Sequence, residues 1–402
     1  MVALRDSWFF IILFSSRLRV SVVSLTLVEP RAAYIHVPFC RHHCGYCNFT
    51  VVAGRDDLIE QYLVAIDREL SGLGDPRPID TLFLGGGTPT HLPPGALERL
   101  LQSIRRWFVL SNHCEFSVEA NPADVTADVV QLLVAHGATR VSLGAQSFDS
   151  VKLQRLERDH VAADIERAVS LSRDAGLDVS LDLIFAAPGE TLAGWQHDVE
   201  TAVLLRPDHI STYGLTYERG TTFWGRLIRG DLRRAEEESE RAMYLAAIDA
   251  LARAGFEHYE VSNFARPGHR CRHNEVYWAG DGYFAAGPGA ARYIDGRRET
   301  NHRSTMTWLK RVMAGESPVA EQEMLGAEDR AREMLVLGLR RLAGVDRAPF
   351  AARTGFDVDE LGGPELRGFV ERGLLADDGR TVRLSRAGLL VSDAMWSKLL
   401  RK

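Results

Sequence analysis

The chain has 402 residues, of which 46% are hydrophobic and 25% charged, a composition typical of a soluble globular protein with one large and one smaller domain. Its net charge of -6 comes without a strongly basic block, which argues against a general nucleic-acid binder. Three of its five cysteines fall in one short motif, so the cysteines indicate no disulfide framework and favour a reducing cytoplasm.

We interpret residues 1–30 as an N-terminal extension that is disordered or weakly amphipathic. The apolar run within it, residues 8–14, is too short to span a bilayer. A secretory signal would need a longer apolar stretch and a cleavage site of small residues. The alternative is a peripheral contact of this run with a membrane surface.

Between residues 31 and 265, short β-rich segments alternate with longer helical ones, a pattern that predicts parallel strands joined by crossover helices. In the first of the helices, Leu58, Tyr62 and Ile66 recur on one face, and a further helix is predicted at 236–254. The predicted strands are residues 34–37, 81–84, 115–119, 140–143, 179–184 and 209–215. Six such strands indicate an α/β fold with a partial (β/α)6 barrel of the TIM type.

The pattern changes beyond the barrel. Residues 266–320 are rich in glycine and aromatic residues and are predicted to form a connecting segment. Residues 321–402 are predicted to form a small accessory domain, in which a helical section is followed by Gly373, a strand at 381–384 and a last helix. This order resembles a winged helix, but the domain mixes acids with arginines, which disfavours DNA binding.

Cys40, Cys44 and Cys47 stand as CxxxCxxC just after the first predicted strand. A four-iron, four-sulfur cluster takes one thiolate per iron, so three cysteines leave one iron without a protein ligand. That iron can chelate the amino and carboxylate groups of S-adenosylmethionine, and an electron passed through the cluster can break the sulfonium bond to give a deoxyadenosyl radical. The alternative is a zinc loop in which His42 or His43 supplies the fourth ligand.

Further polar motifs fall at the carboxyl ends of the predicted strands, where functional groups gather in barrels of this kind. The glycine run at residues 85–87 lets a ligand approach the backbone closely. Glu119 ends the third strand, Gln146 follows the fourth, and Asp182 lies on the fifth. Their side chains can accept hydrogen bonds from hydroxyl or ammonium groups, so we expect them to face one mouth together with the cysteine loop.

The run YIHVPFCRHHCGYCNF, with Tyr34, His36 and Pro38 before the first cysteine and Tyr46 before the third, resembles the radical SAM superfamily. The resemblance extends from about Tyr34 to the C-terminus. It is closest to the branch that holds the anaerobic coproporphyrinogen oxidases and the haem chaperones. It implies a 4Fe-4S cluster on the three cysteines and S-adenosylmethionine bound beside it.

The resemblance also implies which residues contact S-adenosylmethionine. In this superfamily the glycine segment meets the methionine ammonium group, an arginine offers a donor fork to a carboxylate, and acidic side chains accept from hydroxyls. A glycine in the last strand lets adenine approach the backbone. The implied residues are Tyr34, Tyr46, Gly86, Gly87, Thr88, Glu119, Gln146, Arg158, Asp182 and Gly214.

A later segment resembles the HNxxYW motif of the haem chaperone branch, where it is associated with haem; here it consists of His273, Asn274, Tyr277 and Trp278. A histidine offers an axial nitrogen to iron, and two aromatic side chains offer flat faces to a porphyrin. The alternative is structural: the His-Asn pair caps a turn and both aromatics belong to the core.

Phe49 stands where the anaerobic oxidases carry a further cysteine. This difference favours a chaperone that binds haem and delivers it to apo-cytochromes of the respiratory chain, with a low-potential electron donor as a further partner. The alternative is an oxygen-independent coproporphyrinogen III oxidase, which forms protoporphyrinogen IX by oxidative decarboxylation, and a third possibility is radical chemistry on another substrate. Smaller departures are Ala186, where relatives often have glycine, and Ala291 with Arg292, where they usually have His-Ser.

Overall fold

The computed structural model describes residues 29–400 of the chain. The predicted N-terminal extension, with its apolar run and the membrane contact considered for it, lies outside the described residues except for Glu29 and Pro30. No helix within residues 29–400 is both long and apolar enough to cross a lipid bilayer.

A parallel β-sheet with crossover helices forms the centre of the described part of the chain, as the alternating sequence pattern predicts. All six predicted strands are confirmed: β1 (Ala32–Val37), β4 (Arg77–Gly86), β5 (Phe108–Ala120), β6 (Arg140–Gln146), β7 (Asp178–Phe185) and β8 (His209–Gly214). Each of them pairs parallel with the next, and helices connect them. These elements are the partial (β/α)6 barrel.

Three short strands that the sequence pattern does not predict widen this sheet: β9 (Glu257–Glu260), β10 (Asn263–Ala265) and β11 (Phe284–Ala286). The order within the described residues is β11-β1-β4-β5-β6-β7-β8-β10-β9, in which β9 and β10 run antiparallel. Since β11 pairs parallel with β1, the segment 266–320 also contributes to the barrel sheet. Runs of three or four residues are too short to show a periodicity, so the sequence pattern predicts the six barrel strands and not these three additional ones.

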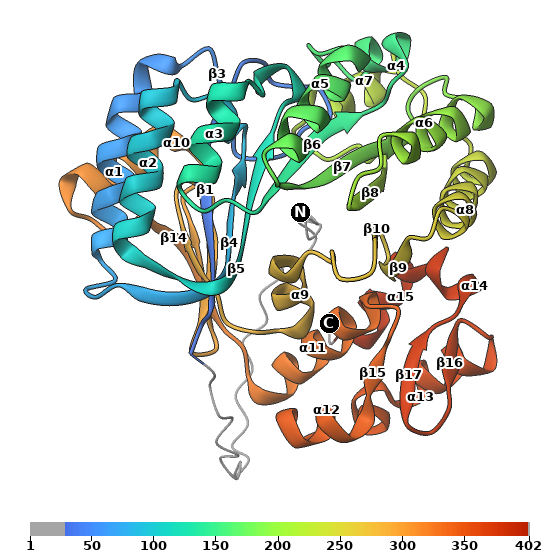
Figure 1. Ribbon diagram of the computed structural model, residues 1–402. Coiled ribbons are helices and arrows are strands. Elements are labelled where there is room, and N and C mark those ends of the chain that lie inside the picture. Colours follow the sequence, from blue (N-terminus) through green and yellow to red (C-terminus); the bar gives the residue numbers. More distant parts are fainter. Residues whose placement is uncertain (1–28, 401–402) are drawn as a thin grey trace.

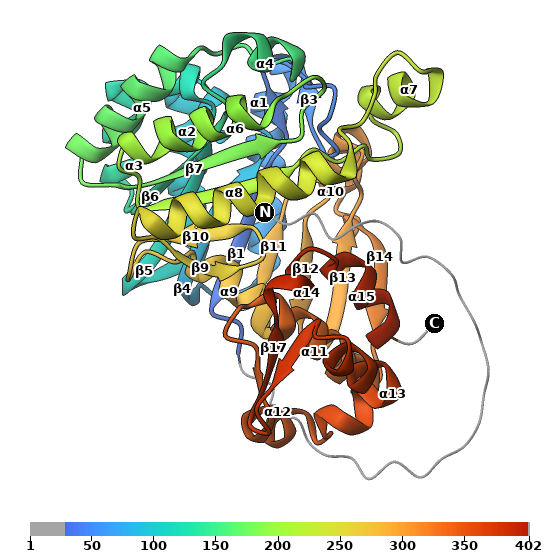
Figure 2. The ribbon, with the colours of Figure 1, turned by 90° about the vertical axis from the view of Figure 1, so that its right-hand side faces the viewer.

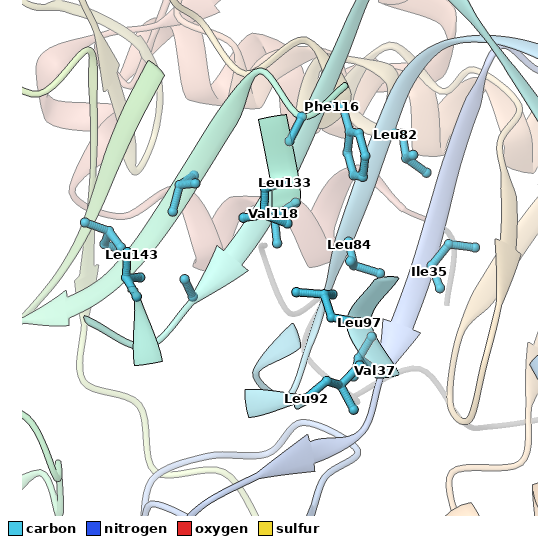
Figure 3. Close-up of a cluster of buried hydrophobic side chains, with 14 of the residues drawn as sticks. Ile35, Val37, Leu82, Leu84, Leu92, Leu97, Phe116, Val118, Leu133 and Leu143 are labelled. Carbon is cyan, nitrogen blue, oxygen red and sulfur yellow. The ribbon is translucent and has the colours of Figure 1, made fainter. Parts of the chain in front are cut away.

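Helices cover one face of the sheet, and their apolar side chains meet those of the strands in the main core (Figure 1). In α1 (Ile59–Ser71), Tyr62, Ile66 and Leu70 recur with helical spacing and are all buried. Figure 3 shows another part of this core, in which Leu97 of the next helix lies among strand residues such as Val37. The remaining helices of the barrel are α2 (Pro94–Trp107), α3 (Ala127–Ala135), α4 (Ser150–Arg155), α5 (Ala162–Asp174), α6 (Leu192–Leu204), α7 (Thr222–Arg229) and α8 (Glu237–Arg253).

The other face of the strands carries polar and aromatic side chains. Successive residues of a strand point to opposite faces, so Leu82 belongs to the core whereas its neighbours Thr81 and Phe83 point into the barrel. The same alternation gives the barrel lining Tyr34, His36, Glu115, Glu119, Arg140, Ser142, Asp182 and His209. We call the carboxyl ends of these strands the mouth of the barrel and their amino ends its floor.

The carboxylate of Glu69 makes several of the hydrogen bonds between the barrel and the segment after α8. Glu69 of α1 accepts hydrogen bonds from the backbone N–H of Gly287 at 3.0 Å, from Asn301 Nδ2 at 2.6 Å and from Trp308 Nε1 at 2.9 Å. Its position therefore holds three distant parts of the segment against the barrel. The other elements of the segment are α9 (Arg272–Ala279), β12 (Ala291–Ile294), β13 (Arg297–Asn301), α10 (Thr305–Ala314) and β14 (Val319–Met324).

The C-terminal part forms a small domain with its own apolar core, which lies on the floor side of the barrel (Figure 2). A helix, a short strand, two helices and a hairpin follow one another, and the strands form one sheet, which is a winged-helix arrangement. The buried ion pair between Arg340 and Glu260 of β9, at 2.6 Å, helps to dock it on the barrel. Its elements are α11 (Ala327–Arg340), β15 (Val345–Asp346), α12 (Arg347–Thr354), α13 (Val358–Glu371), β16 (Leu375–Asp377), β17 (Thr381–Leu384), α14 (Arg386–Leu389) and α15 (Ser392–Leu399).

Candidate functional site

The three cysteines lie on a loop at the mouth that follows β1 and includes β2 (Phe39–Cys40), which pairs with β3 (Val52–Ala53). The backbone N–H of Cys47 donates to the carbonyl of Cys44 at 3.0 Å and closes a turn. The three thiols form no disulfide, and burial raises the pKa of Cys40 to about 12 and that of Cys47 to about 11. Iron binding must therefore displace protons from this loop.

The alternative of a single zinc ion is not supported by the positions of the side chains. Thiolates around one zinc lie about 3.8 Å apart, given Zn–S distances of about 2.3 Å. Within residues 29–400, one group of three Cys, His, Asp or Glu side chains has its ligating atoms within 4.8 Å of one another. This group consists of Asp178, Asp208 and His269 and includes none of the cysteines. Nε2 of His43 lies 3.2 Å from the carbonyl of Cys47, to which it can donate. The thiols are thus spread more widely than one zinc ion requires.

Helix α7 packs against the cysteine loop. The backbone N–H of Phe223 donates to the carbonyl of Gly45 at 2.8 Å, and the rings of Phe223 and Tyr46 meet edge to face with centroids 6.1 Å apart. A Cβ on Gly45 would lie 2.5 Å from the Phe223 ring, so only glycine fits here. The sequence motifs did not single out Gly45, although its place between two of the cysteines was a signal that could have done so.

The glycine run at the end of β4 lies beside the cysteine loop. A Cβ on Gly86, whose φ is +110°, would clash with the ring of His36. A Cβ on Gly87 would lie 2.7 Å from a backbone carbonyl oxygen of the cysteine loop. Oγ1 of Thr88 lies 3.5 Å from Sγ of Cys40. These glycines are therefore required for close packing of the backbone, whereas their contact with a methionine ammonium group stays a prediction.

Glu119 and Asp182 bring two carboxylates into the barrel near its mouth. The backbone N–H of Gly86 donates to Oε2 of Glu119 at 2.8 Å, and the hydroxyl of Ser142 donates to Oδ2 of Asp182 at 3.3 Å. Burial raises the pKa of Glu119 to about 7, to which the charge of Asp182 also contributes, and burial raises the pKa of Asp182 as well. Both groups can accept hydrogen bonds from hydroxyl groups of a ligand.

Arg158 connects the cysteine loop to the barrel. Its Nη1 donates to Sγ of Cys44 at 3.5 Å, and its Nη2 donates to the carbonyl of Gly144 at 3.0 Å and to Oδ1 of Asn121 at 3.4 Å. Burial acts to lower the pKa of Arg158, but Tyr46 and Cys44 outweigh it, so this pKa lies above its ordinary value. Nε is buried without a hydrogen-bond partner in the structure, so the guanidinium has a donor to offer to a bound anion.

The remaining predicted contacts lie on the same strands. Gln146, the last residue of β6, has a left-handed φ of +62°, a conformation that is uncommon for a residue other than glycine and that the surrounding structure must hold in place. Ala186, directly after β7, has a φ of +60°, which explains why glycine suits this position. Gly214 ends β8 at the mouth. The hydroxyl of Tyr34 lies deeper in the barrel, 2.9 Å from Nδ1 of His36.

The HNxxYW segment lies at the opposite end of the barrel, where α9 crosses the floor (Figure 1). Nδ1 of His273 lies 3.0 Å from Oγ1 of Thr81, and its Nε2 lies 2.8 Å from the hydroxyl of Tyr277. Burial lowers the pKa of His273 to about 3, and Asn274 and Trp278 are buried beside it. Both ring nitrogens are engaged, so a haem contact stays a prediction that requires α9 to move.

Comparisons with known proteins agree with this fold. Family models match at residues 34–202, the radical SAM superfamily, and at residues 325–391, the HemN C-terminal domain. The heme chaperone HemW of Bacillus subtilis is 34% identical over 92% of this chain and 99% of its own length, and that of Synechocystis is 37% identical over 80% of both chains. The structure of coproporphyrinogen III oxidase (HemN) from Escherichia coli aligns with a TM-score of 0.82 over 92% of this chain and 90% of that one. At 21% sequence identity, this similarity shows a shared fold only.

The fold is a (β/α)6 barrel whose mouth carries three thiols on its first loop, with a partly buried arginine beside them and two carboxylates nearby. This arrangement, together with the family match, defines a radical SAM protein. The superfamily implies a 4Fe-4S cluster and S-adenosylmethionine, and the donor groups at the mouth fit both. Given the near-full-length match to the relatives from Bacillus subtilis and Lactococcus lactis, the chain belongs to the HemW family.

Proposed function

We propose that this chain is a haem chaperone, which binds haem as its cargo and delivers it to apo-cytochromes of the respiratory chain. The proposal depends on one observation, the match over nearly the whole chain to relatives named heme chaperone HemW. Phe49 supports it as well. This side chain, 40% exposed, occupies the place at which the oxidases carry a further cysteine.

The mouth would hold the cofactors through residues that already lie together there. The three cysteines would bind iron, and the cluster, when bound, supplies a low-potential electron for cleavage of the sulfonium bond of S-adenosylmethionine. Arg158 would pair with the carboxylate of this ligand, since its buried Nε has no partner in the structure. Glu119 and Asp182 would accept from its hydroxyl groups.

The proposed cellular compartment and partners follow from the chemistry of the cysteines and from the charge of the chain. Five cysteines free of disulfides suit a reducing cytoplasm, and the cluster would receive its electron from a low-potential donor protein. The net charge of -6 gives no reason to expect nucleic acid as a partner.

Anaerobic reconstitution with iron and sulfide, followed by titration with haem, tests the proposal. We expect a stable complex with a shifted Soret band, and transfer of this haem to an added apo-cytochrome. Absence of any Soret shift with fully reconstituted protein would show that the chain is not a haem chaperone.

The alternative function, oxygen-independent oxidation of coproporphyrinogen III, is favoured by the similarity of the fold to HemN. The same reconstituted protein, incubated with coproporphyrinogen III, dithionite and S-adenosylmethionine, separates the two functions. Formation of protoporphyrinogen IX would support the oxidase, whereas the chaperone is expected to leave this substrate unchanged.

A further inference from the structure

Helix α4, the short helix that follows β6 at the mouth, lies in sequence between two of the predicted contacts to S-adenosylmethionine. Gln146 ends β6 shortly before the helix, and Arg158 follows shortly after it. The backbone N–H of Arg158 donates to the carbonyl of Leu153, within α4, at 2.9 Å. The position of α4 therefore determines where both of these side chains lie.

Lys152 of α4 is buried, which is unusual for a lysine and requires partners for its charge. Its Nζ donates to Oε1 of Glu190 at 2.5 Å and to Oδ2 of Asp198 at 2.9 Å. The side chains of these three residues are between 1% and 7% exposed. Nζ also lies 5.0 Å from the centroid of the Trp195 ring, so carboxylates and an aromatic face surround the ammonium group.

The carboxylate of Asp198, on α6, fixes the turn after β6. Its Oδ1 accepts from the backbone N–H of Phe148 at 2.7 Å, and its Oδ2 accepts from the hydroxyl of Ser147 at 2.7 Å. These two residues directly follow Gln146 in the chain. Asp198 therefore holds the backbone immediately beyond Gln146.

The carboxylate of Glu190 fixes the turn after β7 in the same way. Its Oε2 accepts from the backbone N–H of Ala187 at 2.9 Å, and Ala187 directly follows Ala186. Because Lys152 binds both carboxylates, its ammonium group joins the turn after β6 to the turn after β7.

Backbone strain gathers in the turns that this network connects. Within residues 29–400, five residues other than glycine have a positive φ, and three of them are Gln146, Glu157 and Ala186. Glu157 directly precedes Arg158 at the end of α4. Such conformations persist only where the surrounding structure holds them in place. The buried ion pairs of Lys152 supply contacts of this kind on both turns.

We propose that Lys152 is a positioning residue of the S-adenosylmethionine site. Its ion pairs hold the two turns and α4 in the arrangement in which Gln146, Arg158 and the backbone beside Ala186 meet the ligand. Lys152 acts through these turns and not by contact, because its ammonium group is already enclosed by its partners. This inference rests on the proposed cofactor site and does not depend on haem as the cargo.

The test replaces Lys152 by methionine, which removes the ammonium group and keeps a side chain of similar length. The full-length, anaerobically reconstituted protein is titrated with S-adenosylmethionine in a calorimeter, and its iron content is measured. We expect Lys152→Met to bind the ligand roughly tenfold more weakly at wild-type iron content, because the ligand must then order the turns as it binds.

Hydrogen exchange gives a second measurement, which needs neither cluster nor ligand. The backbone N–H groups of Phe148 and Ala187 donate to the two carboxylates, so they report on the turns directly. Both are expected to exchange faster in Lys152→Met than in the wild type. Wild-type exchange of both amides would overturn the inference.

Arg340→Met is the matched control, since it breaks a different buried ion pair, with Glu260, on the floor side of the barrel. Urea unfolding should show a loss of stability in this variant too, but its affinity for S-adenosylmethionine should equal that of the wild type. The comparison separates positioning from a general loss of stability. If Lys152→Met also bound the ligand with wild-type affinity, its network would be merely structural and the inference would be overturned.

If Lys152→Met does not fold, Glu190→Gln replaces it. Glutamine keeps an acceptor for the N–H of Ala187 but removes one of the two charges paired with Lys152. We expect roughly two- to fivefold weaker binding, and wild-type affinity would overturn the inference alone. Failure of the wild-type protein to bind S-adenosylmethionine would contradict the proposed cofactor site, and the inference with it.

Discussion

Arg158 donates a hydrogen bond from Nη1 to Sγ of Cys44 over 3.5 Å, which ties the middle cysteine of the loop to the barrel wall. The same guanidinium donates to the carbonyl of Gly144 on β6. One side chain thus serves both the loop and the proposed ligand, and its replacement gives the first prediction.

Arg158→Ala is expected to weaken binding of S-adenosylmethionine by roughly tenfold or more, since a charged hydrogen bond to its carboxylate is lost. Calorimetric titration of the reconstituted protein measures the affinity, and iron content shows whether the cluster persists. The control is Arg155→Ala, because this exposed arginine donates to the carbonyl of Pro188 and should leave the affinity unchanged. Equal affinities of wild type and Arg158→Ala would contradict the proposed role.

Glu119→Gln is expected to stabilise the cluster-free protein at high pH. Burial places the folded pKa of Glu119 at about 7, above its ordinary value of 4.5, so the folded state holds a proton there more tightly than the unfolded chain does. The wild type therefore loses stability as pH rises from about 4.5 to 7 and stays less stable above it, by an amount on the order of 3 kcal/mol.

Glutamine removes this pH dependence and keeps an acceptor for the N–H of Gly86. Thermal melting of both proteins at about pH 5 and about pH 8 checks the prediction. The advantage of Glu119→Gln should be larger at the higher pH. A difference that does not change with pH would show that the carboxyl group is not protonated in the folded state.

Gly45→Ala is expected to disturb the cysteine loop, because its Cβ would lie 2.5 Å from the ring of Phe223. Such overpacking costs about 1–3 kcal/mol, and it should also lower the iron bound per chain. Denaturant unfolding and iron analysis measure the two effects. Gly95→Ala is the matched control, since a Cβ there meets no atom within 4 Å. Similar behaviour of the two variants would argue against the packing of α7 on the loop.

Glu69→Ala is expected to destabilise the protein by about 3 kcal/mol or more, since three buried donors lose their acceptor. Urea unfolding measures the change. For comparison, Glu60→Ala removes an exposed ion pair with Arg99 and should cost less than about 1 kcal/mol. If both variants lost equally little stability, Glu69 would not be an important contact between the barrel and the segment after α8.

The strands and helices of the barrel could be predicted because each shows its own local pattern. The run around Leu82 alternates between core and barrel lining, and Tyr62 and Ile66 recur with helical spacing. The strand β11 could not be found in this way, because three residues carry no period and its place is set by pairing with β1. The position of β11 depends on its pairing with β1, which lies about 250 residues earlier in the chain.

The candidate site could be predicted in part. Glu119 and Gly86 could be placed together because the carboxyl ends of parallel strands meet at one edge. The environment of His273 could not be predicted, since its partners Thr81 and Glu115 lie more than a hundred residues earlier. A local motif identifies a helix, but it does not tell at which end of the barrel the helix packs.

Strand β4 takes part in both ends of the molecule. Its Gly86 donates to Glu119 near the mouth, and its Thr81 bonds to His273 near the floor. The two residues are five positions apart along an extended strand, a distance of about 16.5 Å at 3.3 Å per residue. Over this length β4 is hydrogen-bonded to β1 on one side and to β5 on the other, so it is expected to move as one rigid element. A displacement of Gly86 along the strand axis would therefore also displace Thr81 relative to the imidazole of His273.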